Sequence, residues 1–355
     1  MEYRKELEER ALQQLPEQPD FAASAVLQEQ FARALWGRVA FGDEPDVGSA
    51  RFANLPLYAQ EVELQRQHGL ALVAVAQRQA DPEWARQIAS FPLYASDRSL
   101  PQLHARALSA CSEALTARAR EQFLLLAQAE AVAEEIQQIP GFAESAAMQI
   151  HYGDALYSLM WGWRQAVPPT QQNHRKAQSL VRRVRTLPKM DTEEALLTRW
   201  LPEIVRVEPH FASRLPDLPG FATSGILQDH YAAFLSMEAS RAWTAPDALA
   251  RAQEIPALPL FAQWPSMAQA YVLALGHVLC RGGADDISLM QQVVEQLQSG
   301  LSPNPAPALR GWDALLALQP DNDDFRRGRG AWLARFGFPE EASLADVVRR
   351  RWTSP

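Results

Sequence analysis

A short turn sequence, Pro-X-aromatic-Ala, recurs along this chain, and the same residue pattern follows each copy. The aromatic residues of the complete copies are Phe21, Tyr58, Tyr94, Phe142, Phe221 and Phe261, and Met190 marks a degenerate copy. Neighbouring copies are separated by 31 to 48 residues. Self-similarity at such a period indicates a repeat architecture, in which each unit packs against its neighbours.

Each turn precedes a segment with the periodicity of an amphipathic helix. Large apolar or ring residues stand six, ten and fourteen positions after the aromatic, as at Leu27, Phe31 and Leu35. A spacing of four places them on one helix face. Small residues beside them let a second helix approach closely. Another apolar pair precedes each turn, where the proline ends its helix. The sequence therefore predicts an all-α fold of stacked antiparallel helix pairs.

Composition narrows the class of protein. The chain has 355 residues, 47% of them hydrophobic, and a formal net charge of −8, which argues against a nucleic-acid binder. Its two cysteines, Cys111 and Cys280, lie too far apart in sequence for a disulfide framework or a zinc motif. The charged start and the absence of a long apolar run predict a cytoplasmic protein with no membrane segment.

The last part of the chain resembles a tetratricopeptide repeat. Residues 312–342 read WDALLALQPDNDDFRRGRGAWLARFGFPEEA. Pro320 closes one helix, Gly330 and Leu333 lie on the next, Gly337 makes a turn, and Ala342 lies on the helix that follows. The likeness is looser over residues 21–290, where Gln28, Gln65, Gln149 and Gln228 replace the small residue usual in the family.

This resemblance implies a right-handed α-solenoid of about seven to eight helix pairs that acts as a binding scaffold without catalytic residues. A single solenoid is expected over residues 1–355. It would comprise a capping helix at 1–20, divergent helix pairs at 21–300, and a tetratricopeptide-like repeat with a basic tail at 301–355.

In this family the first helix of each pair lines the concave face, so positions eight and twelve after the aromatic are predicted to point into a groove. They are Glu29, Arg33, Arg66, Gln102, Arg106, Asp154, Asp229 and Gln269. Their mixed charge favours a protein or peptide partner over a polyanion. His151 and His230 stand nine positions after their turn aromatics. They either line the same groove or face solvent.

Other aromatic and ring residues have two interpretations each. Trp161 and Trp163 either pack at the end of a helix or anchor a partner, since tryptophan is frequent in interface hot spots. His68 and His104 occupy a position held elsewhere by Phe or Tyr, so half-buried rings in a helix seam are favoured over metal ligands. No catalytic motif is found, and neither a metal nor a cofactor is predicted.

Two alternatives to a peptide-binding scaffold stay open. Arginine-rich segments could contact nucleic acid, and they lie at residues 182–185, 326–329 and 349–351. The chain could also be a regulatory or inhibitor module of a larger assembly. A hidden hydrolase or transferase is a third reading that lacks a supporting motif. An exposed loop is expected from Val167 to His174.

Overall fold

The computed structural model describes residues 2–42, 44–119, 123–299 and 305–353, and within these ranges every regular element is a helix. The all-α prediction is therefore confirmed for the described residues. The chain divides into two compact units, Met1–Val207 and Glu208–Pro355. None of the described helices is both long enough and apolar enough to cross a membrane. That one solenoid runs through both units stays a prediction.

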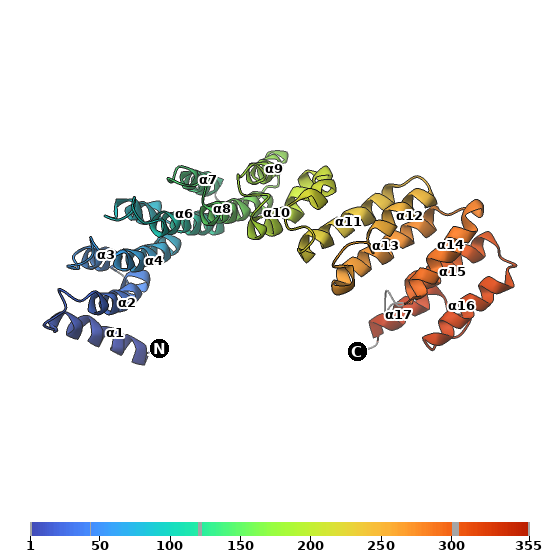
Figure 1. The fold of residues 1–355 in the computed structure, drawn as a ribbon, viewed down its shortest axis with the longest axis horizontal. Coiled ribbons are helices and arrows are strands. Elements are labelled where there is room, and N and C mark those ends of the chain that lie inside the picture. The colour runs from blue at the N-terminus through green and yellow to red at the C-terminus, as the bar shows by residue number, and fades with distance from the viewer. Residues whose placement is uncertain (1, 43, 120–122, 300–304, 354–355) are drawn as a thin grey trace. The chain divides into compact units, whose positions relative to one another are not determined.

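The first unit consists of helices that follow one another along the chain (Figure 1). They are α1 (Glu2–Gln14), α2 (Ala25–Phe41), α3 (Pro45–Ala53), α4 (Val62–Gln79), α5 (Pro82–Arg86), α6 (Ser99–Arg118), α7 (Phe123–Gln137), α8 (Ala146–Gln165), α9 (Gln171–Arg185) and α10 (Glu194–Val207). Short 3₁₀ segments follow α1 and α5, at Leu15–Glu17 and Gln87–Ser90.

The second unit opens with a 3₁₀ segment, η4 (Pro209–Asp217), and continues in helices. These are α11 (Gly225–Arg241), α12 (Ala245–Glu254), α13 (Pro265–Arg281), α14 (Ile287–Gln298), α15 (Ala306–Leu318), α16 (Asp323–Arg335) and α17 (Leu344–Thr353). Further 3₁₀ segments precede α13 and α14, at Phe261–Gln263 and Ala284–Asp286.

The recurring turn is a reverse turn that joins two helices. In the second copy the N–H of Tyr58 donates to the carbonyl of Leu55 at 3.0 Å, and the degenerate copy closes in the same way at Met190. The helix that follows several of these turns begins at a serine whose hydroxyl accepts the N–H three residues on, as Ser24 and Ser145 do. Local hydrogen bonding therefore fixes where each helix starts.

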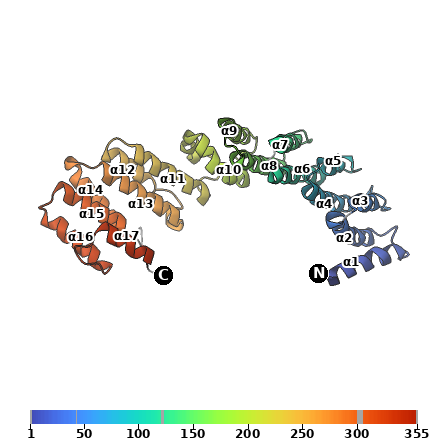
Figure 2. The same ribbon diagram turned by 180° about the vertical axis from the view of Figure 1, so that it is seen from behind.

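The helices that follow the turns pack on one another within each unit. Helix α4 contacts α2 and α6, α6 contacts α8, and α13 contacts α11; Figure 2 shows these helices from behind. Helix α13 also contacts α15, which follows no copy of the turn. The leucines predicted at position fourteen are all buried: Leu35, Leu72, Leu108, Leu156, Leu235 and Leu275. Small residues allow close approach, since a Cβ on Gly153 would lie 2.7 Å from Leu196.

Two local expectations are wrong. Ala342 lies before α17 and not on it, because the Ser343 hydroxyl accepts the N–H of Asp346 and starts the helix after that residue. The loop expected from Val167 to His174 is shorter, because Thr170 caps α9 and places His174 inside that helix. Gly337 does make the predicted turn, with a φ of 70°.

Candidate partner-binding site

Several predicted groove residues form ion pairs with carboxylates or guanidinium groups of the same or a neighbouring helix. Arg33 lies 3.8 Å from Glu29 on α2, and Arg66 lies 3.0 Å from Glu63 on α4. Both are short-range helical pairs between partly exposed groups, so each contributes only tenths of a kcal/mol. These side chains remain accessible and can exchange their partners for those of a ligand.

Asp154 of α8 is held more firmly. Its carboxylate lies 2.8 Å from Arg199 of α10, whose guanidinium also sits 4.9 Å from the centre of the Tyr157 ring. Burial raises the pKa of Asp154, and Arg199 opposes that shift. The predicted groove residue is thus tied to the next helix pair.

The two histidines of the predicted groove are half-buried and neutral at pH 7. Burial and, to a smaller extent, the charge of Arg106 together lower the pKa of His151 to about 4. Burial also lowers the pKa of His230, against the opposing effect of Asp229. The structure therefore brings Arg106 near His151 and Asp229 near His230. Gln102 is half-buried on α6, and Gln269 is exposed on α13.

Of the two tryptophans considered as anchors, Trp161 is the more accessible, with 39% of its surface exposed. The Arg164 guanidinium lies 5.4 Å from the centre of its ring, and the Tyr157 ring packs edge-on at 6.4 Å. Trp163 is half-buried on the same helix. Trp161 is therefore supported by packing on one side and open on the other.

His68 is buried and His104 is half-buried, and each packs against the tyrosine ring of its own turn, Tyr58 or Tyr94. His68 stacks between Phe52 and Phe91, and its nitrogens bond the hydroxyls of Ser49 (2.6 Å) and Tyr58 (2.8 Å). Burial lowers its pKa to about 3. Over the part of the chain that the structure describes, no group of three His, Cys, Asp or Glu side chains is placed to hold a metal ion.

Two of the three arginine-rich segments, at residues 182–185 and 326–329, pair with carboxylates, whereas the side chains of Arg350 and Arg351 in the third lie outside the described residues. Arg183 contacts Glu130 at 2.7 Å, and Arg185 contacts Asp191 at 2.8 Å. In α16, Arg326 contacts Asp323 at 3.0 Å and Arg329 contacts Asp313 at 2.7 Å. A phosphate would have to displace these carboxylates. Nucleic-acid binding through the segments stays an untested alternative.

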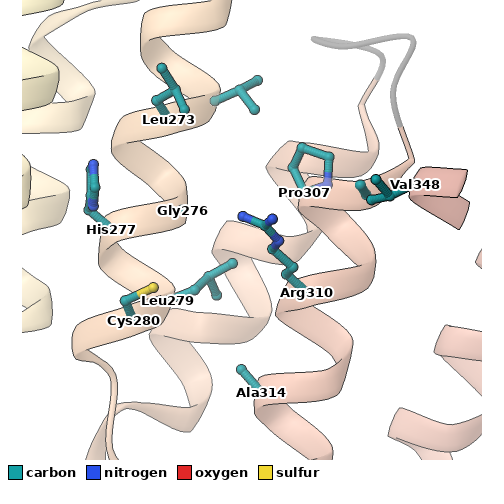
Figure 3. Close-up of a pocket in the computed structure, with 11 residues that line it drawn as sticks. Leu273, Gly276, His277, Leu279, Cys280, Pro307, Arg310, Ala314 and Val348 are labelled. Carbon is teal, nitrogen blue, oxygen red and sulfur yellow. The ribbon is translucent and has the colours of Figure 1, made fainter. Parts of the chain in front are cut away.

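The second unit contains a groove between α13 and α15. Its volume is about 890 Å³, and residues of α13 and α15 form its sides, with Val348 of α17 at one end. Figure 3 shows Leu273 and His277 on α13 and Pro307 and Arg310 on α15. We call this feature the α13–α15 groove.

The chemistry of the α13–α15 groove is apolar with one strong charge. Leu273 is 63% exposed and lines the groove. The Arg310 side chain extends into the space between the helices (Figure 3), and no ion pair is seen for it among the described residues. Leu273 stands twelve positions after Phe261, at one of the predicted groove positions, but sequence reasoning selected only polar residues and missed it.

The four glutamines that depart from the family pattern form a device that sequence reasoning also missed. Each is fully buried and stands seven positions after the turn aromatic. The Gln28 amide donates to the carbonyls of Phe21 (2.8 Å) and Ala22 (3.1 Å) in its own turn. Its oxygen accepts the N–H of Leu57, in the next turn, at 2.9 Å. We call this arrangement a glutamine clasp.

The clasp recurs at three other junctions. Gln149 and Gln228 donate to two carbonyls of the aromatic turn of their own unit, and Gln65 donates to the carbonyl of Tyr58 alone. Each oxygen accepts an N–H of the next turn, at Leu93 for Gln65, Lys189 for Gln149 and Leu260 for Gln228. All these distances lie between 2.7 and 3.0 Å. The sequence signal for the clasp was a glutamine seven positions after the turn aromatic.

No protein-family model, curated protein or solved structure matches this chain.

Proposed function

We propose that the chain is a right-handed tetratricopeptide-like α-solenoid and a non-catalytic scaffold that binds a peptide segment of a partner protein. The observation that carries this proposal is the α13–α15 groove, where an exposed leucine and an arginine without an ion pair among the described residues face the same space. Helices that follow successive turns also contact one another within each unit, which supports the stacking.

The groove chemistry suggests the kind of peptide. An apolar side chain would remove Leu273 from water, and burial of one leucine-sized surface contributes about 1.5–3 kcal/mol. A carboxylate of the peptide would pair with Arg310, whose planar guanidinium can bond both oxygens. The preferred ligand is therefore a short peptide with an apolar residue beside an acidic one.

The test is selection of phage-displayed peptides on the immobilised protein, followed by affinity measurement on Leu273→Asp and Val26→Asp variants. Both residues are 63% exposed, but Val26 lies on α2 and outside the groove. We expect L273D to weaken binding of selected peptides by about tenfold or more and V26D to leave it unchanged. Equal affinity for both variants would refute the assignment of the groove.

A further inference from the structure

The turns joined by a glutamine clasp share one backbone geometry. Their residue after proline is Leu57, Leu93, Lys189 or Leu260, and none of these has a positive φ. Leu260 has φ −103° and ψ 9°, close to the third residue of a type I turn. In this geometry the N–H of that residue points at the glutamine oxygen.

Two turns differ, and both carry glycine after the proline. Gly141 and Gly220 each have a φ of 82°, which defines a type II turn. The closing bond is unchanged, since the N–H of Phe142 still donates to Ile139 at 3.1 Å. Between the two turn types ψ of the proline differs by about 150°, so the peptide after it is turned over. The carbonyl of Pro140 thus takes the direction that an N–H has in a clasped turn.

The helix that faces the Gly141 turn lacks the glutamine. Pro101 of α6 occupies the position seven residues after Tyr94. The carbonyls of Tyr94 and Ala95, which correspond to those bonded by Gln28 in the first clasp, accept no hydrogen bond from the residues that the structure describes. A glutamine at this position would place its oxygen against the Pro140 carbonyl, so the flipped peptide excludes a clasp.

A pocket of about 720 Å³ lies between the Tyr94 turn and the Gly141 turn, where no glutamine clasp is present. Tyr94, Ala95 and Pro140, the residues that carry the three carbonyls, all line it together with Gly141. Two carboxylates, Asp97 and Glu144, also line it, against one cation, Arg98. Hydrogen bonds from Ser99 hold the pKa of Asp97 below its usual value, so this carboxylate is charged at neutral pH. The lining is rich in acceptors and carries a net negative charge.

We propose that this pocket binds the guanidinium group of an arginine side chain in a partner peptide. Guanidinium has five N–H donors in a planar fork and no acceptor. It can therefore donate to carbonyls of both turns, and it has no oxygen of its own that would lie against a carbonyl oxygen. A carboxamide matches the Tyr94 and Ala95 carbonyls but not that of Pro140. This site belongs to the first unit, and it stands independently of the peptide proposed for the α13–α15 groove.

The test is a titration of the ¹⁵N-labelled full chain with N-acetyl-arginine N-methylamide, followed by TROSY NMR. The amide nitrogens of Ala95, Ser96 and Gly141 are bonded to the three carbonyl carbons, so their signals report hydrogen bonds to those carbonyls. We expect these signals to move with the arginine compound and to stay in place with the corresponding glutamine and norleucine compounds. Equal shifts with glutamine, or none with arginine at millimolar concentrations, would overturn the proposal.

The lysine compound separates the guanidinium from cations in general. Binding by arginine at least about tenfold tighter than by lysine supports the guanidinium fork, whereas equal affinity overturns the choice of arginine.

A matched pair of variants tests the flipped peptide itself. Gly141→Leu creates the sequence of a clasped turn and favours type I geometry, which removes the Pro140 carbonyl from the pocket. Gly220→Leu makes the same change in the other glycine turn, which does not line this pocket. We expect G141L to weaken arginine binding by about tenfold and G220L to leave it unchanged. Unchanged binding in G141L would overturn the proposal, and if that variant fails to fold, the comparison of the four compounds on the natural chain decides.

Discussion

Replacing Gln149 by methionine tests the energetic role of a glutamine clasp. Methionine has nearly the same length and shape, so packing in the buried site is conserved while three hydrogen bonds are lost. The Gln149 amide donates to Phe142 at 3.0 Å and Ala143 at 2.9 Å, and its oxygen accepts the N–H of Lys189 at 2.8 Å.

The magnitude follows from those three bonds. A hydrogen bond between neutral groups contributes about 0.5–1.5 kcal/mol net, and more when its removal leaves a buried group without a partner. Phe142 and Lys189 are half-buried and Ala143 is exposed, so water can satisfy part of what the glutamine releases. We therefore expect Gln149→Met to lower the free energy of unfolding by about 2 kcal/mol.

Urea denaturation followed by circular dichroism measures this loss, with Gln30→Met as the matched control. Gln30 is exposed on α2 in the same unit, so Q30M is expected to change stability by less than about 0.5 kcal/mol. Hydrogen exchange gives a local readout, because the Lys189 amide loses its acceptor only in Q149M and should exchange faster there. If Q149M lost no more stability than Q30M and kept the protection of Lys189, the clasp would be energetically neutral and the reasoning wrong.

Other predictions concern separate features. Pro101→Gln with Gly141→Leu should rebuild a clasp, so denaturation should show the double variant about 1 kcal/mol more stable than the sum of the single changes predicts. His68 has a folded pKa of about 3, below 6.5 in the unfolded chain, so its contribution is complete above pH 6.5 and declines as the pH falls toward 3. Melting temperatures should therefore fall less steeply between pH 6.5 and 4.5 in His68→Phe than in the natural chain. Gly225→Ala should cost about 1–3 kcal/mol, because its Cβ would lie 1.9 Å from an indole ring. Gly276→Ala, with open space around it in the middle of α13, should gain about 0.5–1 kcal/mol, and thermal melts of this glycine pair should move in opposite directions.

The helices could be predicted from the sequence because their signals are local. The turn at Tyr58, the leucine ridge at Leu72 and the caps at Ser24 and Ser145 depend on residues within a few positions of each other. The buried role of His68 was also predictable, since aromatic rings hold its position in other units.

The clasp and the groove were not predictable in the same way. Gln28 bonds a backbone N–H 29 residues away, and a backbone group leaves no residue type in the sequence to mark it. The departure of the glutamines from the family pattern was visible, but their partners were not. Leu273 was missed because only polar residues were taken from the predicted groove positions, and nothing in the sequence marks this leucine as one that stays exposed.

The pairing of clasps with turn types restricts the order in which the repeat units can follow one another. A helix with Gln28, Gln65, Gln149 or Gln228 is always followed by a turn without glycine, whereas the helices with Pro101 and Leu197 precede the turns of Gly141 and Gly220. Near-identical segments are consequently not interchangeable. Joining a glutamine helix to a glycine turn, as deletion of the Tyr94 unit would join Gln65 to the turn of Gly141, would set an amide oxygen against a carbonyl, so an engineered array from this chain must be cut and joined in matched pairs.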